Sequence, residues 1–267
     1  MRLGAIRAVL LTVAAGELVW SLLSYFRPDL ATGMLGRSVL DPVMARQYPL
    51  YLASVALAYA LGAANVRRYP GIVTICLVQR ALEIVVAAID RLTGSLGPAS
   101  FAGLVALELV VTAALLVARK RPARPVERSP ADPRDRGLVR LLRAFGALEL
   151  FWFFASTVFV QLGARLLGWP LQDPYVTQQQ GIALAIIGLV SLLAATDVAR
   201  YRVFVWVPIA SQLIGMANAL NEVRIGTIPL GAAGVQWAIQ ALIAGAFFYF
   251  SRNHRSNQPT RRRATSI

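Results

Sequence analysis

Charged residues are scarce in this chain of 267 residues: they make up 15% of it, against about a quarter of a typical soluble domain. Hydrophobic residues make up 57%, and the mean hydropathy is +0.59. Both values exclude an ordinary soluble domain and indicate a chain that lies in lipid. Eight segments approach or reach the roughly 20 apolar residues that a membrane-spanning helix needs: 4–26, 48–65, 71–89, 101–118, 141–163, 180–196, 203–221 and 231–250.

Histidine, cysteine and lysine each occur once, as His254, Cys76 and Lys120. A single cysteine forms no internal disulfide, and Cys76 lies inside an apolar segment, where cysteine is usually a small core residue. Haem and iron–sulfur centres need sets of His, Met or Cys ligands in familiar arrangements, and none is present. We therefore expect no metal site and no redox metal cofactor.

Motifs of soluble enzymes are missing as well. The sequence has no G-x-S-x-G, no phosphate-binding P-loop and no H-E-x-x-H. The apolar segments also contain no histidine that would serve as a base. An enzyme that acts alone is therefore the least favoured class.

What the sequence does contain is an internal repeat. Glu17-Leu18-Val19-Trp20 returns 132 residues later as Glu149-Leu150-Phe151-Trp152. The same spacing, without any gap, relates five further pairs: Leu35-Gly36 with Leu167-Gly168, Asp41-Pro42 with Asp173-Pro174, Gln47 with Gln179, Arg68-Tyr69 with Arg200-Tyr201, and Gly94 with Gly226. The intact loop lengths indicate a tandem duplication with four spanning helices in each copy.

We therefore predict an all-α membrane protein with eight transmembrane helices in two parallel-repeat four-helix bundles. Four helices return the chain to its starting side, so the copies share one orientation and a pseudo-twofold axis along the membrane normal. The Asp-Pro pairs are predicted to start a short helix or lid segment. The expected parts are a first repeat, a basic cytoplasmic linker, a second repeat and a basic cytoplasmic tail: 1–118, 119–139, 140–250 and 251–267.

The basic residues are distributed unevenly between the two predicted sides of the membrane. Twenty of the 27 fall on the side of both chain ends, six fall on the other side, and Arg80 lies inside an apolar segment. Basic residues mark the cytoplasmic side, which predicts a multi-pass protein of the bacterial inner membrane with both termini in the cytoplasm. The net charge of +14 lies mainly in the linker and the tail, which favours contact with lipid head groups over nucleic acid.

Ionisable residues inside the apolar segments are the candidate functional groups. Each costs about 2.5–3.5 kcal/mol on insertion scales and usually faces the interior of the bundle. Arg80 and Glu83 are three residues apart and share one helix face, within reach of carboxylates from neighbouring helices. We predict a polar cluster that serves either as an interhelical clamp or as a pocket for a ligand, proton or quinone: Glu17, Gln79, Arg80, Glu83 and Glu108.

The second copy keeps the carboxylate Glu149 but changes the other positions. At the repeat spacing Arg80 corresponds to Gln212, Glu83 to Gly215 and Glu108 to Gln240. A charged pocket is therefore expected in the first copy, whereas the second is expected to be structural or to hold a neutral ligand. Each carboxylate shares a helix face with a tryptophan, which is typical of an interfacial anchor and also suits a pocket for an amphipathic ring: Glu17 with Trp20, and Glu149 with Trp152.

Several short motifs give each copy a family resemblance. They are the polar turn after the first helix, Gln179-Gln180-Gly181 with Leu189, Asp197-Val198-Ala199-Arg200-Tyr201, and Gly226. Each copy thereby resembles the BphX-like and DoxX-like group of small four-helix bacterial membrane proteins. The first copy departs from the pattern with Asn65 at the acidic position. The resemblance implies the architecture and an accessory role beside quinone-linked oxidoreductases, with no catalytic residue to transfer.

Three functional hypotheses follow. The leading one is an integral membrane accessory or scaffold subunit that docks a quinone-linked membrane complex, with lipids and a membrane protein as partners. The alternative is a transporter or binding protein for a small molecule or lipid, with a site between or within the repeats. The third is a membrane enzyme or a quinone-binding redox subunit. Apart from a quinone, we expect no cofactor.

Overall fold

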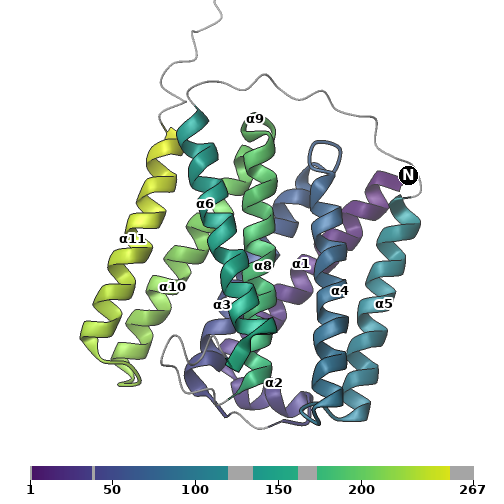
Figure 1. Ribbon diagram of the computed structural model, residues 1–267. Helices are drawn as coiled ribbons and strands as arrows, with labels where there is room; N and C mark the ends of the chain where they lie inside the picture. Colours follow the sequence, from purple (N-terminus) through teal and green to yellow (C-terminus); the bar gives the residue numbers. More distant parts are fainter. Residues whose placement is uncertain (1, 38–39, 120–134, 162–172, 253–267) are drawn as a thin grey trace, which may run out of the picture.

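The computed structural model describes residues 2–37, 40–119, 135–161 and 173–252, and these residues form helices and turns without any β-strand. Most of the predicted linker (119–139) and tail (251–267) lies outside the described residues. The helices run roughly alongside one another (Figure 1). Their bounds are α1 Arg2–Phe26, α2 Pro28–Met34, α3 Pro42–Ala64, α4 Gly71–Leu92, α5 Pro98–Arg119, α6 Arg136–Phe153, the π-helix η2 Phe154–Val158, α8 Pro174–Thr196, α9 Val198–Tyr201, the 3₁₀-helix η3 Arg202–Val205, α10 Trp206–Arg224 and α11 Leu230–Arg252.

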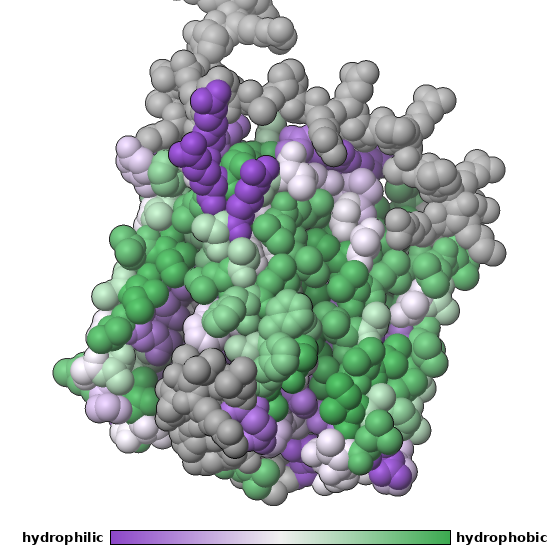
Figure 2. Space-filling view, viewed as in Figure 1, coloured by the Kyte–Doolittle hydropathy of each residue, from purple (hydrophilic) through white to green (hydrophobic). Residues whose placement is uncertain are grey.

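Six helical segments are long and apolar enough to cross a membrane: Leu3–Phe26, Gly71–Leu92, Pro98–Ala118, Pro174–Thr196, Val198–Arg224 and Leu230–Arg252. Together they indicate a multi-pass membrane protein. The other two predicted spans overlap α3 and α6, whose polar residues lower their hydropathy. The side of the bundle seen in Figure 2 is covered largely by hydrophobic residues, as a surface in contact with acyl chains would be.

Both long helices that follow an Asp-Pro pair begin at the proline. The Asp41 side chain accepts hydrogen bonds from the backbone N–H groups of Val43 and Met44 at 3.0 Å. Asp173 likewise accepts from the backbone N–H of Val176 at 3.2 Å. An N-cap aspartate followed by proline favours a helix start, so α3 and α8 each begin six residues before the apolar segments predicted at 48 and 180. The pairs start the long helices rather than short lid segments.

The middle of the bundle is formed by α3 and α8, which pack against each other. Of the six span candidates α8 is the most buried, whereas α5 and α11 are the most exposed and lie at opposite edges of Figure 1. The core around α3 and α8 combines buried side chains from both halves of the chain, among them Tyr59, Ile72, Ile186 and Phe204. The two halves therefore share one core.

At the end of the bundle that carries α9, two arginines make reciprocal contacts. Arg68 Nε donates to the backbone oxygen of Arg200 at 3.2 Å, and Arg200 Nε donates to the backbone oxygen of Arg68. The rings of Tyr69 and Tyr201 lie next to each other, with centroids 5.9 Å apart. Equivalent residues 132 positions apart thus meet each other across the boundary between the halves.

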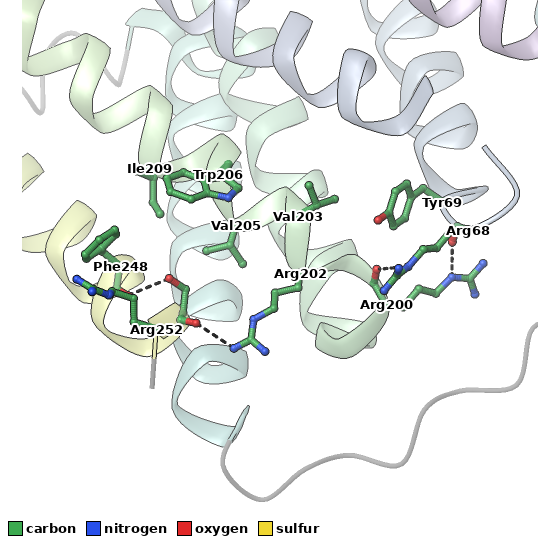
Figure 3. A pocket seen from close by; sticks show the side chains of 11 residues that line it. Arg68, Tyr69, Arg200, Arg202, Val203, Val205, Trp206, Ile209, Phe248 and Arg252 are labelled. Atoms are coloured by element: carbon green, nitrogen blue, oxygen red, sulfur yellow. Dashed lines mark hydrogen bonds between the residues drawn. The ribbon is translucent and has the colours of Figure 1, made fainter. Parts of the chain in front are cut away.

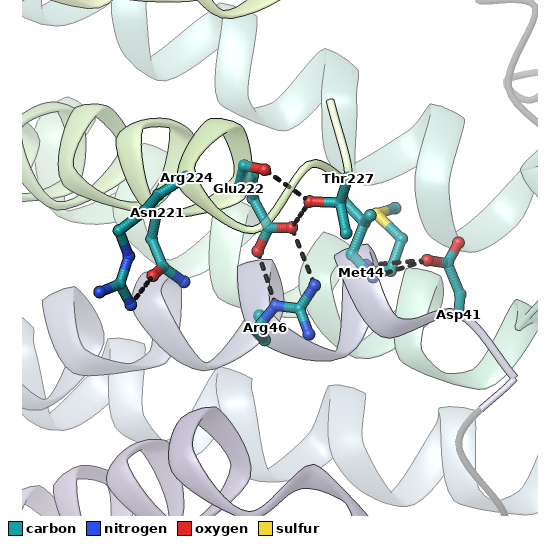
Figure 4. Close-up of polar contacts among 8 residues, drawn as sticks. Asp41, Met44, Arg46, Asn221, Glu222, Arg224 and Thr227 are labelled. Atoms are coloured by element: carbon teal, nitrogen blue, oxygen red, sulfur yellow. Dashed lines mark hydrogen bonds and ion pairs between the residues drawn. The ribbon is translucent and has the colours of Figure 1, made fainter. Parts of the chain in front are cut away.

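At the opposite end, two buried ion pairs join the halves. Arg46 on α3 contacts Glu222 on α10 through two hydrogen bonds of 2.6 and 2.8 Å, and Thr227 also donates to Glu222 (Figure 4). Arg37 lies 3.0 Å from Asp173, whose side chain is 1% exposed. A bidentate Arg–carboxylate contact fixes the geometry of both partners, so these pairs position α3 and α10, and the start of α8, relative to each other.

Two glycines allow α6 to approach α8 closely. A Cβ atom added to Gly188 would lie 2.9 Å from the carbonyl oxygen of Gly146, and one added to Gly146 would lie 2.9 Å from that of Gly188. Small residues at such positions let helix backbones approach in membrane proteins. The contact places Glu149 of α6 against α8, since its Cβ atom lies 3.1 Å from the same added atom on Gly188.

We predict that Gly188→Ala destabilises the protein by about 1–3 kcal/mol, because the new methyl group meets backbone that cannot move cheaply. Gly16→Ala is the matched control, since an added Cβ there meets nothing within 4 Å. Thermal unfolding in detergent, followed by circular dichroism, measures both variants. Equal melting temperatures for the two would contradict the close α6–α8 contact.

Candidate functional site

Four residues of the predicted polar cluster meet inside the first half of the chain. Arg80 Nη1 donates to Glu108 Oε1 at 3.0 Å, and Arg80 Nη2 donates to Glu17. Gln79 donates to the same Glu17 oxygen at 2.9 Å and accepts from the hydroxyl of Tyr59. The side chains of Arg80 and Glu108 are each 7% exposed. One guanidinium group thus joins carboxylates from α1 and α5 to α4.

The fifth residue of the predicted cluster, Glu83, lies beside these ion pairs rather than in them. It lines a cavity of about 10 Å³ with Glu108 and Gln179, which is room for one water molecule at most. Trp20 lines a different small cavity, of about 30 Å³, near Tyr48. The first half is therefore closely packed around its charged residues, an arrangement that suits the interhelical clamp.

A far larger cavity, of about 840 Å³, lies around Glu149 in the second half. Its walls come from α6, η2, α8, α10 and α11, and from α3 of the first half. This volume falls in the range of small-molecule sites, about 300–1,000 Å³. The sequence pointed to the first copy for a charged pocket, but the structure has the large cavity at the second. The predicted residues Glu149, Trp152, Gln212 and Gln240 all line it.

Glu149 differs from its counterpart Glu17 in having no cationic neighbour. It is 6% exposed, and among the described residues its side chain forms neither an ion pair nor a hydrogen bond. The guanidinium that neutralises Glu17 belongs to Arg80, and the second half has Gln212 at that position. A buried carboxyl without a partner is costly, so this one requires a proton or a partner that is not among the described residues.

Amide side chains are the most frequent of the other polar groups in the cavity. Gln180, Gln212, Gln236 and Gln240 line it. The Oε1 atoms of Gln180 and Gln240 are buried and have no hydrogen-bond partner. Apolar side chains, including those of Leu184, Ile239 and Ile243, form much of the remaining wall. The cavity is thus apolar, with several acceptor atoms that lack donors.

Two local features of the second half make room for this cavity. Helix α6 ends in the π-helical turn η2, and Ala155 and Ser156 of that turn line the cavity. The equivalent residues 22–26 of the first half continue α1 as a regular α-helix. Gly215 replaces Glu83, and its missing side chain leaves space that the Gln240 amide approaches. π-Turns inside helices are frequent at functional sites.

Sequence reasoning missed other parts of this region. Arg46, Arg37 and Glu222 were assigned to loops or left out, yet they form the buried ion pairs between the halves. Tyr51 of α3 was not singled out, but it lines the large cavity. The one available signal was Glu222, next to the end of the apolar segment 203–221. An acidic residue at such a position needs a partner, and this would have pointed to an ion pair.

Comparison of the chain with protein-family models, with curated proteins and with solved structures found no match.

Replacing Arg80 should strand two buried carboxylates, Glu17 and Glu108. We predict that Arg80→Ala costs about 3–5 kcal/mol of stability, as breaking a buried ion pair does. Arg224→Ala is the control, because Arg224 is exposed and contacts only the side chain of Asn221; it should change stability by at most about 0.5 kcal/mol. Melting curves in detergent compare the two variants, and similar losses would count against the clamp.

Proposed function

We propose that this protein binds a small amphipathic molecule in the membrane, with its site in the cavity around Glu149. The observation that carries the proposal is a cavity of ligand size, about 840 Å³, that contains a buried carboxyl without a partner among the described residues. The first half fills the equivalent region with its own ion pairs. The second half leaves the corresponding space to a molecule from outside.

The polar atoms of the cavity favour a ligand head group that donates hydrogen bonds. The Oε1 atoms of Gln180 and Gln240, which have no partner among the described residues, are acceptors, and so is the Glu149 carboxylate when it is ionised. Leaving buried acceptors unpaired costs about 1–3 kcal/mol each, so a hydroxyl or protonated amine gains from filling them. A quinol, with two phenolic hydroxyls on a ring and an apolar tail, belongs to this class, whereas the oxidised quinone presents only acceptors.

The position of the cavity favours entry from the lipid. Leu148 of α6 and Val235 and Ile239 of α11 line it and are 43%, 63% and 54% exposed. On the face in Figure 2, hydrophilic residues are visible in the otherwise apolar surface on the side of α11. An amphipathic ligand would slide its head group between α6 and α11 while its tail stays among acyl chains.

The proposal includes the finer architecture: eight spanning helices in two repeats of one orientation, with both ends of the chain in the cytoplasm. Support comes from the contacts between Arg68 and Arg200, from the equivalent caps Asp41 and Asp173, and from the positive φ angles of Gly94 and Gly226, +78° and +75°. The described chain begins and ends at the same end of the bundle (Figure 1).

A role as accessory subunit of a quinone-linked complex in the bacterial inner membrane stays a prediction from the sequence and its family resemblance. The exposed apolar side chains of α5 and α11 are accounted for by lipid, so they do not by themselves call for a protein partner. A binding protein for a quinol would also serve such a complex. The two roles are therefore compatible.

Decylubiquinol and decylubiquinone make a matched pair of probes for the site. We predict that the quinol raises the melting temperature of the purified full chain, because a ligand that binds only the folded state stabilises it. The quinone should need an about tenfold higher concentration for the same rise, since it brings no donors to Glu149 and Gln240. Equal effects of the two probes would argue against the donor requirement.

Two variants test whether the quinol binds in the cavity around Glu149. Gln240→Leu should weaken the quinol effect about tenfold through loss of an acceptor. Asn221→Leu, at a partly buried position near the end of α10 and outside the lining, is the control and should respond like the unmodified chain. If neither probe stabilises the protein at all, or Gln240→Leu leaves the response unchanged, the proposed site is wrong.

A further inference from the structure

A second cavity, of about 600 Å³, lies at the end of the bundle that carries α9 (Figure 3). Four arginines line it: Arg68, Arg200, Arg202 and Arg252. They come from the turn between α3 and α4, from α9 and η3, and from the end of α11. This cavity shares no lining residue with the one around Glu149.

The positive charges of this cavity are largely uncompensated by the described residues. Asp135 lies 3.9 Å from the guanidinium of Arg202, and the Asp197 side chain accepts a hydrogen bond from the backbone N–H of Arg200 at 3.0 Å. Arg68, Arg200 and Arg252 form no ion pair with any residue in the described ranges. Several cations around one hollow repel each other unless an anion lies between them. The charge balance thus calls for an anion.

Backbone carbonyl groups hold three of the guanidinium groups in place. Arg68 donates to the oxygens of Ala199 and Arg200, Arg200 donates to that of Arg68, and Arg202 donates to that of Ser251 at 3.1 Å. These neutral acceptors orient the groups without cancelling their charge. The Nη2 atom of Arg200 is buried and has no acceptor.

The rest of the lining is largely apolar, which distinguishes this cavity from a binding site for a free anion. Trp206 and Phe248 line it, and the Arg252 guanidinium lies over the Phe248 ring, 5.1 Å from the centroid. Arginine forks suit the oxygens of a phosphate, and the aromatic and aliphatic side chains suit the glycerol and the first carbons of acyl chains. Both chemistries occur together in a phospholipid.

Apart from Arg68 and Tyr69, the residues that line this cavity belong to the second half. At the repeat spacing Arg202 corresponds to Pro70, Trp206 to Thr74 and Phe248 to Leu116. The four-helix unit therefore does not need these residues to fold, since the first half lacks them.

We infer that this cavity binds the phosphate-bearing head group of an anionic phospholipid. The arginines contact the phosphate oxygens, while Trp206 and Phe248 face the apolar part of the lipid. Free inorganic phosphate shares the anionic chemistry but not the apolar contacts. The inference is independent of the ligand proposed at Glu149.

The test compares short-chain lipids on the purified full chain in detergent. We expect dioctanoyl phosphatidylglycerol to raise the melting temperature at an about tenfold lower concentration than dioctanoyl phosphatidylcholine, since the extra charge-assisted contacts are worth about that factor. Inorganic phosphate at the same concentrations should have little effect. If phosphate alone stabilises as strongly as the anionic lipid, the ligand is a free anion and the lipid assignment is wrong.

Arg252→Gln tests the location, because Arg252 is exposed and its loss should leave folding intact. It should reduce the preference for the anionic lipid several-fold, and Arg200→Gln should reduce it further. Arg224→Gln, an exposed arginine at the opposite end of α10, is the control and should keep the full preference. A preference that survives in Arg252→Gln and Arg200→Gln, or is absent from the unmodified chain, overturns the inference.

Discussion

The contact of Arg80 with Glu17 and Glu108 is the interaction on which the interpretation of both halves depends. In an apolar bundle, each carboxylate must find its proton or its cation inside the protein, because the surrounding lipid offers neither. The guanidinium of Arg80 on α4 pairs with both Glu17 of α1 and Glu108 of α5. The helices are thereby tied to one another by charge as well as by packing.

The second half presents the same carboxylate without that guanidinium. Glu149 remains at the position of Glu17, but Gln212 stands where Arg80 would be. The π-turn after α6 lines the cavity beside it, and the Gln240 amide occupies the space at Gly215, where the first half has Glu83. Glu17, which pairs with Arg80, thus corresponds to Glu149, which has no partner among the described residues. The predicted duplication of a four-helix unit would explain this difference, since one copy could maintain stability while the other served the proposed binding.

Much of the fold could be predicted from the sequence, since hydropathy and helix-start signals are local. The eight apolar segments each overlap a helix, and Asp41 and Asp173 start the helices that follow them. The predicted N-terminal ends of α3 and α8 were wrong, because polar residues in the first turns of these helices lower the local hydropathy. The N-cap aspartates and the packing of these two helices allow them to begin there although their first turns are polar.

The site was harder to predict, because cavities depend on what neighbouring helices leave unfilled. The sequence pointed to a charged pocket in the first copy, where Arg80 pairs with Glu17 and Glu108, whereas the large cavity lies around Glu149. It also contained no sign that Arg46 of α3 would reach Glu222 of α10, since that contact depends on how the halves dock. Pairings inside one repeat follow from spacing, whereas pairings between the halves follow from the tertiary structure.

The most direct test of this account restores the missing guanidinium. Gln212→Arg places it at the position equivalent to Arg80, and a double-mutant cycle with Glu149→Gln measures its coupling to the carboxylate. We expect Gln212→Arg to be better tolerated by about 1 kcal/mol or more when Glu149 is present, because the two charges then pair. If Gln212→Arg changes the unfolding free energy equally with and without Glu149, the equivalence of the two halves at this position is contradicted.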